Sequence, residues 1–292
     1  MLLNPKRAEK KPWEMFFVGF VYAAISLVFA NWLFADNPIF KEHISLLIIT
    51  FTVMLSLPFF YFLIKLEEER DYKGEKSGLM KRHGKAINAL IWLFLGYVVA
   101  YSLGYILVPS MIGSTFEAQI EQYCTINMPA QFKECVSKYG GIAIEGDVGK
   151  IDSIGITGKA SSWNYAFDIF ENNLYVMLFS IIFSLIFGAG AIFILAWNAS
   201  VVATAIGIFS KSSISNLPAS LSRYMLHGIP EIAAYFVAAL GGGILGVTLI
   251  KHGTKDPDFS EGLSDSINLI ALALLFLVIG AILEVFVTPR IF

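Results

Sequence analysis

The residues best placed to do chemistry inside a membrane form one run, Ser222-Arg-Tyr-Met-Leu-His-Gly-Ile-Pro-Glu231, which continues as apolar sequence to Ile250. A charged side chain at the centre of a bilayer costs roughly 2.5–3.5 kcal/mol on insertion scales, so such residues persist where they face protein or water. His227 and Glu231 could handle a proton or supply half of a metal site. This run is therefore the candidate functional site.

The geometry of His227 and Glu231 depends on how the helix passes Pro230. One interpretation is a short helix over Pro218–His227 that ends at Gly228, with a second helix beginning at Pro230. Glu231 would then lie in a first turn, where a carboxylate complements the helix dipole. The other is one kinked helix, which places both residues on the same face. A structural role explains them too, since the histidine would bond freed carbonyls and the glutamate would cap amides.

Three further polar residues extend the candidate site. Asn198 ends the predicted fourth span, Glu284 lies near the end of the sixth, and Arg223 precedes His227 by about one turn. Together they would form one polar cluster at the cytoplasmic leaflet. Taken singly, each is also typical of a helix end that is solvated by water or by snorkelling.

No catalytic or metal-binding motif accompanies these residues. One histidine and one glutamate do not complete a metal site, and the chain has no H-E-x-x-H sequence. Ser200 or Ser222 could reach His227, but no nucleophile motif surrounds either serine. We therefore expect no enzyme, no metal and no cofactor, with an intramembrane hydrolase as the least favoured alternative.

Composition indicates the class of protein that must position these residues. Of the 292 residues, 56% are hydrophobic and only 15% are charged, and the mean hydropathy is +0.67. Soluble domains carry about 25% charged residues, so we expect an all-α integral membrane protein surrounded by lipid. No basic stripe suggests nucleic acid, and the first apolar run is expected to be a retained span.

Six stretches are long and apolar enough to cross a bilayer, which takes about 20 residues. They are Met15–Phe34, His43–Ile64, Ile87–Val108, Leu174–Trp197, Pro230–Ile250 and Ile267–Val287. A further apolar stretch, Ala199–Phe209, is expected to be a short re-entrant or interfacial segment whose ends are covered by protein. If it crossed instead, the C-terminus would be external.

Basic residues predict the orientation, because Lys and Arg accumulate on the cytoplasmic side. They are dense before the first span and after the second, whereas Pro109–Asn172 carries an excess of acids. Both termini are therefore expected to be cytoplasmic. The chain divides into a three-helix membrane region (1–108), an external loop domain (109–172) and a C-terminal membrane domain (173–292).

The external loop domain contains both cysteines, Cys124 and Cys135. On the oxidising side of a membrane such a pair is expected to form a disulfide, and two free thiols are the alternative. Protein partners are expected to bind this domain, although no partner motif is visible.

Small residues recur at every fourth position of the fifth span, at Ala234, Ala238, Gly242 and Gly246. The fourth span repeats the pattern with Ser180, Ser184 and Gly188. Such stripes permit close approach of helix backbones in lipid. They are expected to pack against each other or against a second copy of the chain, as in a homo-oligomer.

The C-terminal half contains, in this order, Asn172-Asn173 at the start of one span, Trp197-Asn198 at the end of a small-residue helix, and Leu226-His-Gly-Ile-Pro-Glu-Ile232 before a glycine-rich helix. This order resembles the stage II sporulation protein M family. The resemblance covers Phe170 to the C-terminus. Where the family often has Asn-Gly, this chain has Asn198-Ala199. The positions that match the family pattern are Asn172, Asn173, Asn198, His227, Gly228 and Glu231.

The resemblance implies a polytopic membrane protein without established catalysis, and the family's namesake helps to localise peptidoglycan-degrading enzymes. Our first hypothesis is accordingly a non-enzymatic scaffold that gathers partners at the membrane. The alternative is an ion or small-solute transporter or channel, with Asn198, His227, Glu231 and Glu284 lining a cavity. Broken helices and re-entrant segments favour transport, whereas the sequence shows no convincing inverted repeat between its halves.

Overall fold

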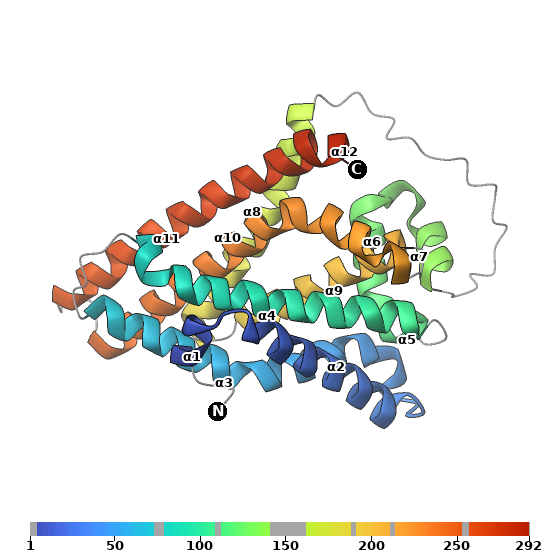
Figure 1. Cartoon of the computed structure of the whole chain (residues 1–292), viewed down its shortest axis with the longest axis horizontal. Helices are drawn as coiled ribbons and strands as arrows, with labels where there is room; N and C mark the ends of the chain where they lie inside the picture. Colours follow the sequence, from blue (N-terminus) through green and yellow to red (C-terminus); the bar gives the residue numbers. More distant parts are fainter. Residues whose placement is uncertain are drawn as a thin grey trace.

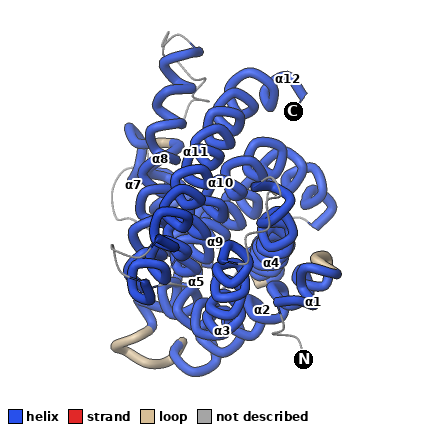
Figure 2. Tube along the Cα trace, turned by 90° about the vertical axis from the view of Figure 1, so that its left-hand side faces the viewer, coloured by secondary structure: helices blue, strands red, loops and turns tan. Residues whose placement is uncertain are grey.

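The computed structural model of the chain describes residues 5–72, 79–108, 112–140, 162–187, 191–210, 214–252 and 257–291. Its described secondary structure is entirely helical (Figures 1 and 2). The long helices are α2 (Glu14–Phe34), α3 (Ile44–Tyr72), α4 (Leu79–Leu107), α8 (Ser162–Phe187), α9 (Ala191–Phe209), α10 (Leu217–His252) and α11 (Pro257–Ile282). The short elements are α1 (Pro5–Lys10), η1 (Lys41–His43), α5 (Ile112–Thr115), α6 (Glu117–Asn127), η3 (Pro129–Gln131), α7 (Phe132–Gly140), η4 (Ile214–Asn216), the π-helical η5 (Leu283–Val287) and α12 (Thr288–Ile291).

Seven helices in the described part of the chain are long and apolar enough to span a membrane. Helices are the expected solution in lipid, because every backbone N–H and C=O must be bonded within the protein. The all-α membrane fold is therefore confirmed. The count of six spans plus a short re-entrant segment is wrong.

The error lies between the predicted fourth span and the segment after it. The predicted span Leu174–Trp197 is divided between two helices, since α8 ends at Phe187 and α9 begins at Ala191. The 19 residues of α9 rise about 28 Å at 1.5 Å per residue, which is close to the thickness of the hydrocarbon core. Ala199–Phe209 is thus the second half of a full-length helix.

Successive long helices alternate in direction. α2, α4, α9 and α11 run toward one end of the bundle, and α3, α8 and α10 run toward the other (Figure 1). The first and last described residues consequently lie at opposite ends of the bundle. Both termini were predicted to share the cytoplasmic side, and the side on which each lies stays a prediction.

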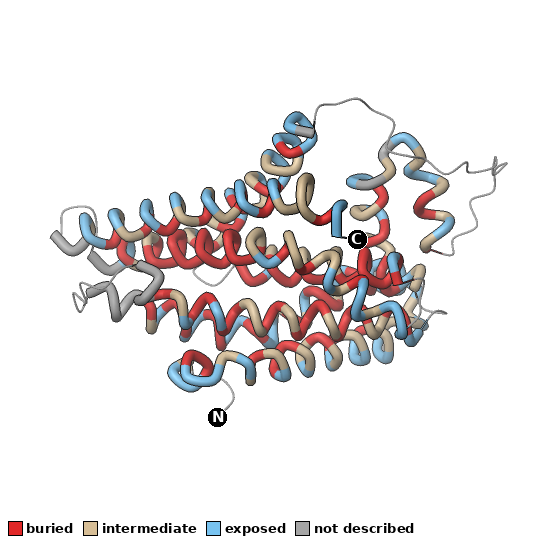
Figure 3. The backbone as a smooth tube through the Cα atoms, turned by 45° about the horizontal axis from the view of Figure 1, so that its top comes forward, coloured by how far each residue is buried: buried red, intermediate tan, exposed pale blue. Residues whose placement is uncertain are grey.

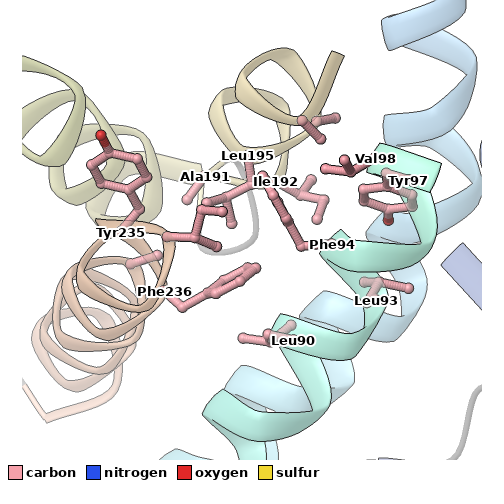
Figure 4. Close-up of a cluster of buried hydrophobic side chains, with 14 of the residues drawn as sticks. Leu90, Leu93, Phe94, Tyr97, Val98, Ala191, Ile192, Leu195, Tyr235 and Phe236 are labelled. Atoms are coloured by element: carbon pink, nitrogen blue, oxygen red, sulfur yellow. The ribbon is translucent and has the colours of Figure 1, made fainter. Parts of the chain in front are cut away.

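The core of the bundle is built around α10, which has the largest buried share of the seven long helices (Figure 3). At its centre Phe236 of α10 packs edge-on against Phe94 of α4, with ring centroids 6.3 Å apart. Ile192 and Leu195 of α9 complete this apolar centre (Figure 4). α2, α8 and α11 lie outside, and fewer than a third of the residues in their most apolar stretches are buried.

The small-residue stripe of α10 packs against α8 of the same chain. A Cβ atom at Gly242 would lie 2.6 Å from the carbonyl oxygen of Ile181, and one at Gly246 would lie 2.5 Å from that of Leu185. Ala234 and Ala238 are completely buried. The α10 stripe therefore packs on α8 of the same chain, as one of the two expectations had it; Gly188 of the α8 stripe lies outside the described residues, and contact between copies stays a prediction.

A cap of short helices, α5, α6 and α7, covers one end of the bundle (Figure 1). The predicted disulfide is present and joins Cys124 of α6 to Cys135 of α7. Thr115 Oγ1 donates to Asn31 Oδ1 of α2 at 2.8 Å, and Gln119 Nε2 donates to the Ser45 carbonyl at 3.3 Å. These hydrogen bonds hold the cap against α2 and α3. Residues 141–161 of the predicted external domain lie outside the described residues.

Removing the disulfide should loosen the cap. A disulfide stabilises a fold by about 2–4 kcal/mol, mainly through the unfolded state. We expect Cys124→Ser to lower the thermal unfolding midpoint in detergent, and Cys135→Ser to lower it equally, because either change removes the same bond. An unchanged midpoint in both variants would contradict a stabilising role.

Candidate functional site

One continuous helix positions the two residues that the sequence singled out. α10 runs from Leu217 to His252 with Pro230 inside it, so the interpretation as two separate helices is wrong and that as a single helix is correct. His227 and Glu231 consequently lie one turn apart on the same face. Pro230 has no N–H with which to bond the carbonyl of Leu226, which locally loosens the helix beside both residues.

Glu231 faces α11 at the point where that helix has a glycine. A Cβ atom at Gly280 would lie 2.5 Å from Cγ and 3.2 Å from Oε1 of Glu231. The carboxylate therefore occupies the space that any side chain at position 280 would fill. Its Oε1 atom is buried and has no hydrogen-bond partner among the residues that the structure describes. An unpaired carboxylate oxygen at a helix interface is costly and marks a place where a ligand would be stabilised.

Asn173 of α8 completes the wall opposite α11. Its side-chain amide interacts with the Glu231 carboxyl group, and its Oδ1 accepts a hydrogen bond from the Tyr235 hydroxyl at 2.8 Å. Tyr235 is buried and lies one turn beyond Glu231 on α10. Sequence reasoning named Asn173 only through the family pattern and missed Tyr235. The spacing Glu231-x-x-x-Tyr235 was the available signal.

Glu284 brings a second carboxylate to the site. It lies in η5, a π-helical turn that follows α11, and it is the charged neighbour of Glu231. Among the described residues, no Lys or Arg forms an ion pair with either carboxylate. π-Helical turns often occur at functional sites, where they redirect one side chain. Here the turn adds a like charge beside a buried acid.

His227 closes the site on the side of α12. Its Nδ1 lies 3.3 Å from Thr288 Oγ1, and the Thr288 hydroxyl itself donates to the Leu283 carbonyl at 3.0 Å. Because that hydroxyl proton is already used, Nδ1 must carry a proton and donate to Oγ1. The other ring nitrogen, Nε2, can then accept a proton.

Asn198 and Asn172 do not join this group. Asn198 Nδ2 donates to Ile194 O of its own helix at 2.7 Å, and Asn172 is exposed. The Arg223 guanidinium stacks over the ring of Phe209 with 4.7 Å to its centroid and lies near His227. Of the predicted cluster, the structure therefore brings Glu231 and Glu284 together and adds Asn173 and Tyr235. His227 lies one turn away from Glu231, next to Arg223.

The site lies at the same end of the bundle as the cap. Tyr224 of α10 interacts electrostatically with Tyr123 of α6, and Tyr123 also interacts with Arg223. The sequence analysis had placed the polar cluster on the side opposite the external domain. That placement is wrong because the additional crossing by α9 reverses the direction of α10.

The arrangement is suited to binding a proton or a small cation. Two carboxyl groups and an amide lie together among packed helices, where an uncompensated negative charge is expensive, and an imidazole lies one helical turn away. No group of three or more His, Cys, Asp or Glu side chains that could hold a metal ion occurs in the described ranges. Ser200 Oγ donates to Trp197 O and Ser222 Oγ to Pro218 O, so neither hydroxyl is directed at His227.

Gly280 offers a direct test of the space around Glu231. In Gly280→Ala the new methyl group would displace the Glu231 side chain, at a cost of about 0.5–1.5 kcal/mol for an unfavourable rotamer. That cost corresponds to a loss of about two- to tenfold in any activity that depends on Glu231. Transport in proteoliposomes is the readout, and the melting midpoint should stay close to that of the wild type. Undiminished transport would show that the position of Glu231 is unimportant.

Comparisons with known proteins agree with this picture. The model of a family described as Stage II sporulation protein M matches residues 9–289. An uncharacterized protein of Methanocaldococcus jannaschii is 30% identical over 159 residues, which are 52% of this chain and 87% of that relative. No solved structure matches the chain. The family match extends the resemblance from the C-terminal half to almost the whole chain.

Proposed function

This chain belongs to the stage II sporulation protein M family, and from that premise we propose that it moves an ion or small solute across the membrane. The Glu231 site binds the proton or cation that moves. The observation that carries the proposal is the meeting of Glu231 and Glu284 inside a multi-pass helix bundle without a described basic partner.

The energetics favour a transport role over a structural one. A structural polar group in a membrane protein normally ends in a satisfied hydrogen bond or an ion pair, as at Tyr235 and Asn173. Glu231 instead has a buried oxygen that no other described residue bonds. Ionisable residues retained inside a bundle typically mark ion pathways and proton relays. A bound proton or cation would neutralise the carboxylate pair and offset the cost of burying it.

The basic residues support one orientation of the bundle. Lys65 and Lys85, at the end of α3 and the start of α4, lie at the end away from the cap. By the positive-inside rule that end is cytoplasmic, so the cap, the Glu231 site and the C-terminus are near the external face. A cysteine introduced at Arg290 should react with a membrane-impermeant thiol reagent added outside intact cells. Reaction only after lysis would show that the bundle has the opposite orientation in the membrane.

A scaffold role is the second candidate, and the cap favours it. The cap is held by a disulfide and presents apolar side chains, with Ile126 52% and Phe132 36% exposed. A partner protein could bind these residues outside the membrane. Ile126→Ser together with Phe132→Ser should then abolish capture of a partner and leave transport unchanged, whereas Glu231→Gln should have the reverse effect.

The deciding experiment is reconstitution of the purified chain into liposomes loaded with dyes sensitive to pH, Na⁺ or K⁺. Under an imposed gradient we expect flux above that of empty liposomes for at least one of these ions. Organic anions and amines form a second panel, monitored through accompanying proton movement. Liposomes that match empty controls in every assay would refute transport.

A further inference from the structure

Two groups of three helices in this bundle share one arrangement, in which the first helix packs on the third, and run in opposite directions. The first unit is α2, α3 and α4, and the second is α8, α9 and α10. In each unit the first and third helices run parallel and touch through small residues. Gly19 of α2 and Gly96 of α4 contact the facing backbone at Leu93 and Phe16. Gly242 and Gly246 of α10 likewise contact the backbone of α8, at Ile181 and Leu185.

The contacts between the units are reciprocal. The third helix of each unit meets the third helix of the other at Phe94 and Phe236 (Figure 4). Each third helix also packs on the second helix of the other unit. Ser102 of α4 donates to the Ala203 carbonyl of α9 at 3.3 Å, and Gly243 of α10 lies against Ile64 of α3. Reciprocal contacts of this kind are expected from a two-fold axis in the membrane plane.

The third helices also share a dipeptide near their starts. α4 has His83-Gly84 and α10 has His227-Gly228, each preceding the apolar part of its helix. Because α4 and α10 run in opposite directions, the two histidines lie at opposite ends of the bundle. His227 belongs to the Glu231 site, and His83 belongs to a pair with Glu67 of α3.

The Glu67–His83 pair is a built site. His83 Nδ1 lies 2.8 Å from Glu67 Oε2, and both side chains are 0% exposed. It lies near the end of α3 and the start of α4, two helices that both contact α1, and these helix ends lie away from the cap (Figure 1). Burial of a hydrogen-bonded histidine–carboxylate pair carries a desolvation penalty, so an apolar pair would serve packing alone at least as well. The pair therefore points to a role beyond packing.

We propose that Glu67–His83 is a second proton-binding site, the counterpart of the Glu231 site at the opposite membrane face. The inverted relation of the two units places one histidine–carboxylate site at each end, as a carrier that exchanges protons with both faces would need. The use of this proton in transport rests on the proposed function, whereas its binding does not.

Other ionisable groups surround this pair. At this end of the bundle, the described charged residues on the elements packed around it are the buried or half-buried Glu9, Glu14 and Asp265 and the exposed Lys6, Arg7, Lys10, Lys65, Lys85 and Glu261. Glu9 is the buried one on α1. Its charge must be held constant in any test, so the variants below leave it unchanged.

The test measures proton release by the purified chain in nanodiscs between pH 5 and 8, the range in which an unperturbed histidine changes charge. Glu67→Gln keeps the size of the side chain and can still accept a hydrogen bond from Nδ1. It removes the negative charge that permits a buried imidazolium, so we expect release to fall by one proton per chain. His83→Gln should give the same loss. Glu42→Gln, at an exposed carboxylate, is the matched control and should release as many protons as the wild type.

Flux in liposomes separates this proposal from the proposed function. If wild-type liposomes show no flux but Glu67→Gln and His83→Gln each release one proton fewer, transport is refuted and the second site stands. If flux is present and both variants release as many protons as the wild type, the pair is only a link between α3 and α4, and the second site is refuted. Should Glu67→Gln fail to fold, the result for His83→Gln decides.

Discussion

Replacing Glu231 by glutamine is expected to reduce transport by about tenfold or more, which corresponds to a loss of at least ~1.4 kcal/mol at the step that it serves. Glutamine keeps the shape of the side chain and its contact with Gly280, yet it cannot exchange a proton and carries no charge for a cation. The measurement is the initial rate of flux in proteoliposomes with equal protein content.

The control for this change is Glu171→Gln on the exposed face of α8, where the carboxylate accepts a hydrogen bond from the Tyr175 hydroxyl at 3.1 Å. That variant should transport like the wild type. Glu284→Gln should also reduce flux, and the double variant with Glu231→Gln should lose little more than the single one, because the two carboxylates act on one bound ion. Full activity of Glu231→Gln would show that Glu231 takes no part in transport.

Substituting Gly242 by alanine is expected to destabilise the bundle. The added methyl group would lie 2.6 Å from a backbone oxygen of α8, so the two helices must separate, and overpacking typically costs about 1–3 kcal/mol. The better helix propensity of alanine returns only about 1 kcal/mol. The thermal unfolding midpoint in detergent should therefore fall.

A glycine-to-alanine substitution elsewhere on α10 separates the steric clash with α8 from the general effect of alanine on the helix. At Gly228 a new Cβ would meet only the ends of Met225 and Ile232, at 3.7 and 3.9 Å. Gly228→Ala should thus leave the midpoint unchanged or raise it. Equal midpoints for the two alanine variants would contradict the close contact of α8 and α10.

Most of the membrane fold could be predicted from the sequence, because long apolar runs have a single structural solution in lipid. α2 and the apolar part of α4 were placed almost correctly. The exception came at Gly188-Ala-Gly190, where apolar sequence continues from one helix to the next. Hydropathy does not separate two helices joined by small apolar residues, although the two glycines were a breaker signal. Because of that single error, the predicted direction of α10 is opposite to the observed one, and the polar site was predicted at the other end of the bundle.

The candidate site was only partly predictable. His227 and Glu231 could be paired because they lie one turn apart on one helix, but Glu284 and Asn173 reach them from α11 and α8 through tertiary packing. Asn198 and Arg223 looked equivalent in the sequence, yet each is satisfied locally, by Ile194 and by Phe209. The inverted relation of the two units could not be seen in the sequence, because their helix–helix contacts use different residue types. The first unit has glycines on both helices, and the second pairs α10 glycines with α8 serines.

The central claim is that the Glu231 carboxyl group binds and releases a proton or cation inside the membrane, and infrared difference spectroscopy tests it most directly. Spectra of the reconstituted chain before and after a change in pH or cation should contain a carboxyl C=O band that is absent from Glu231→Gln. A wild-type difference spectrum identical to that of Glu231→Gln under every ion tested would contradict the account.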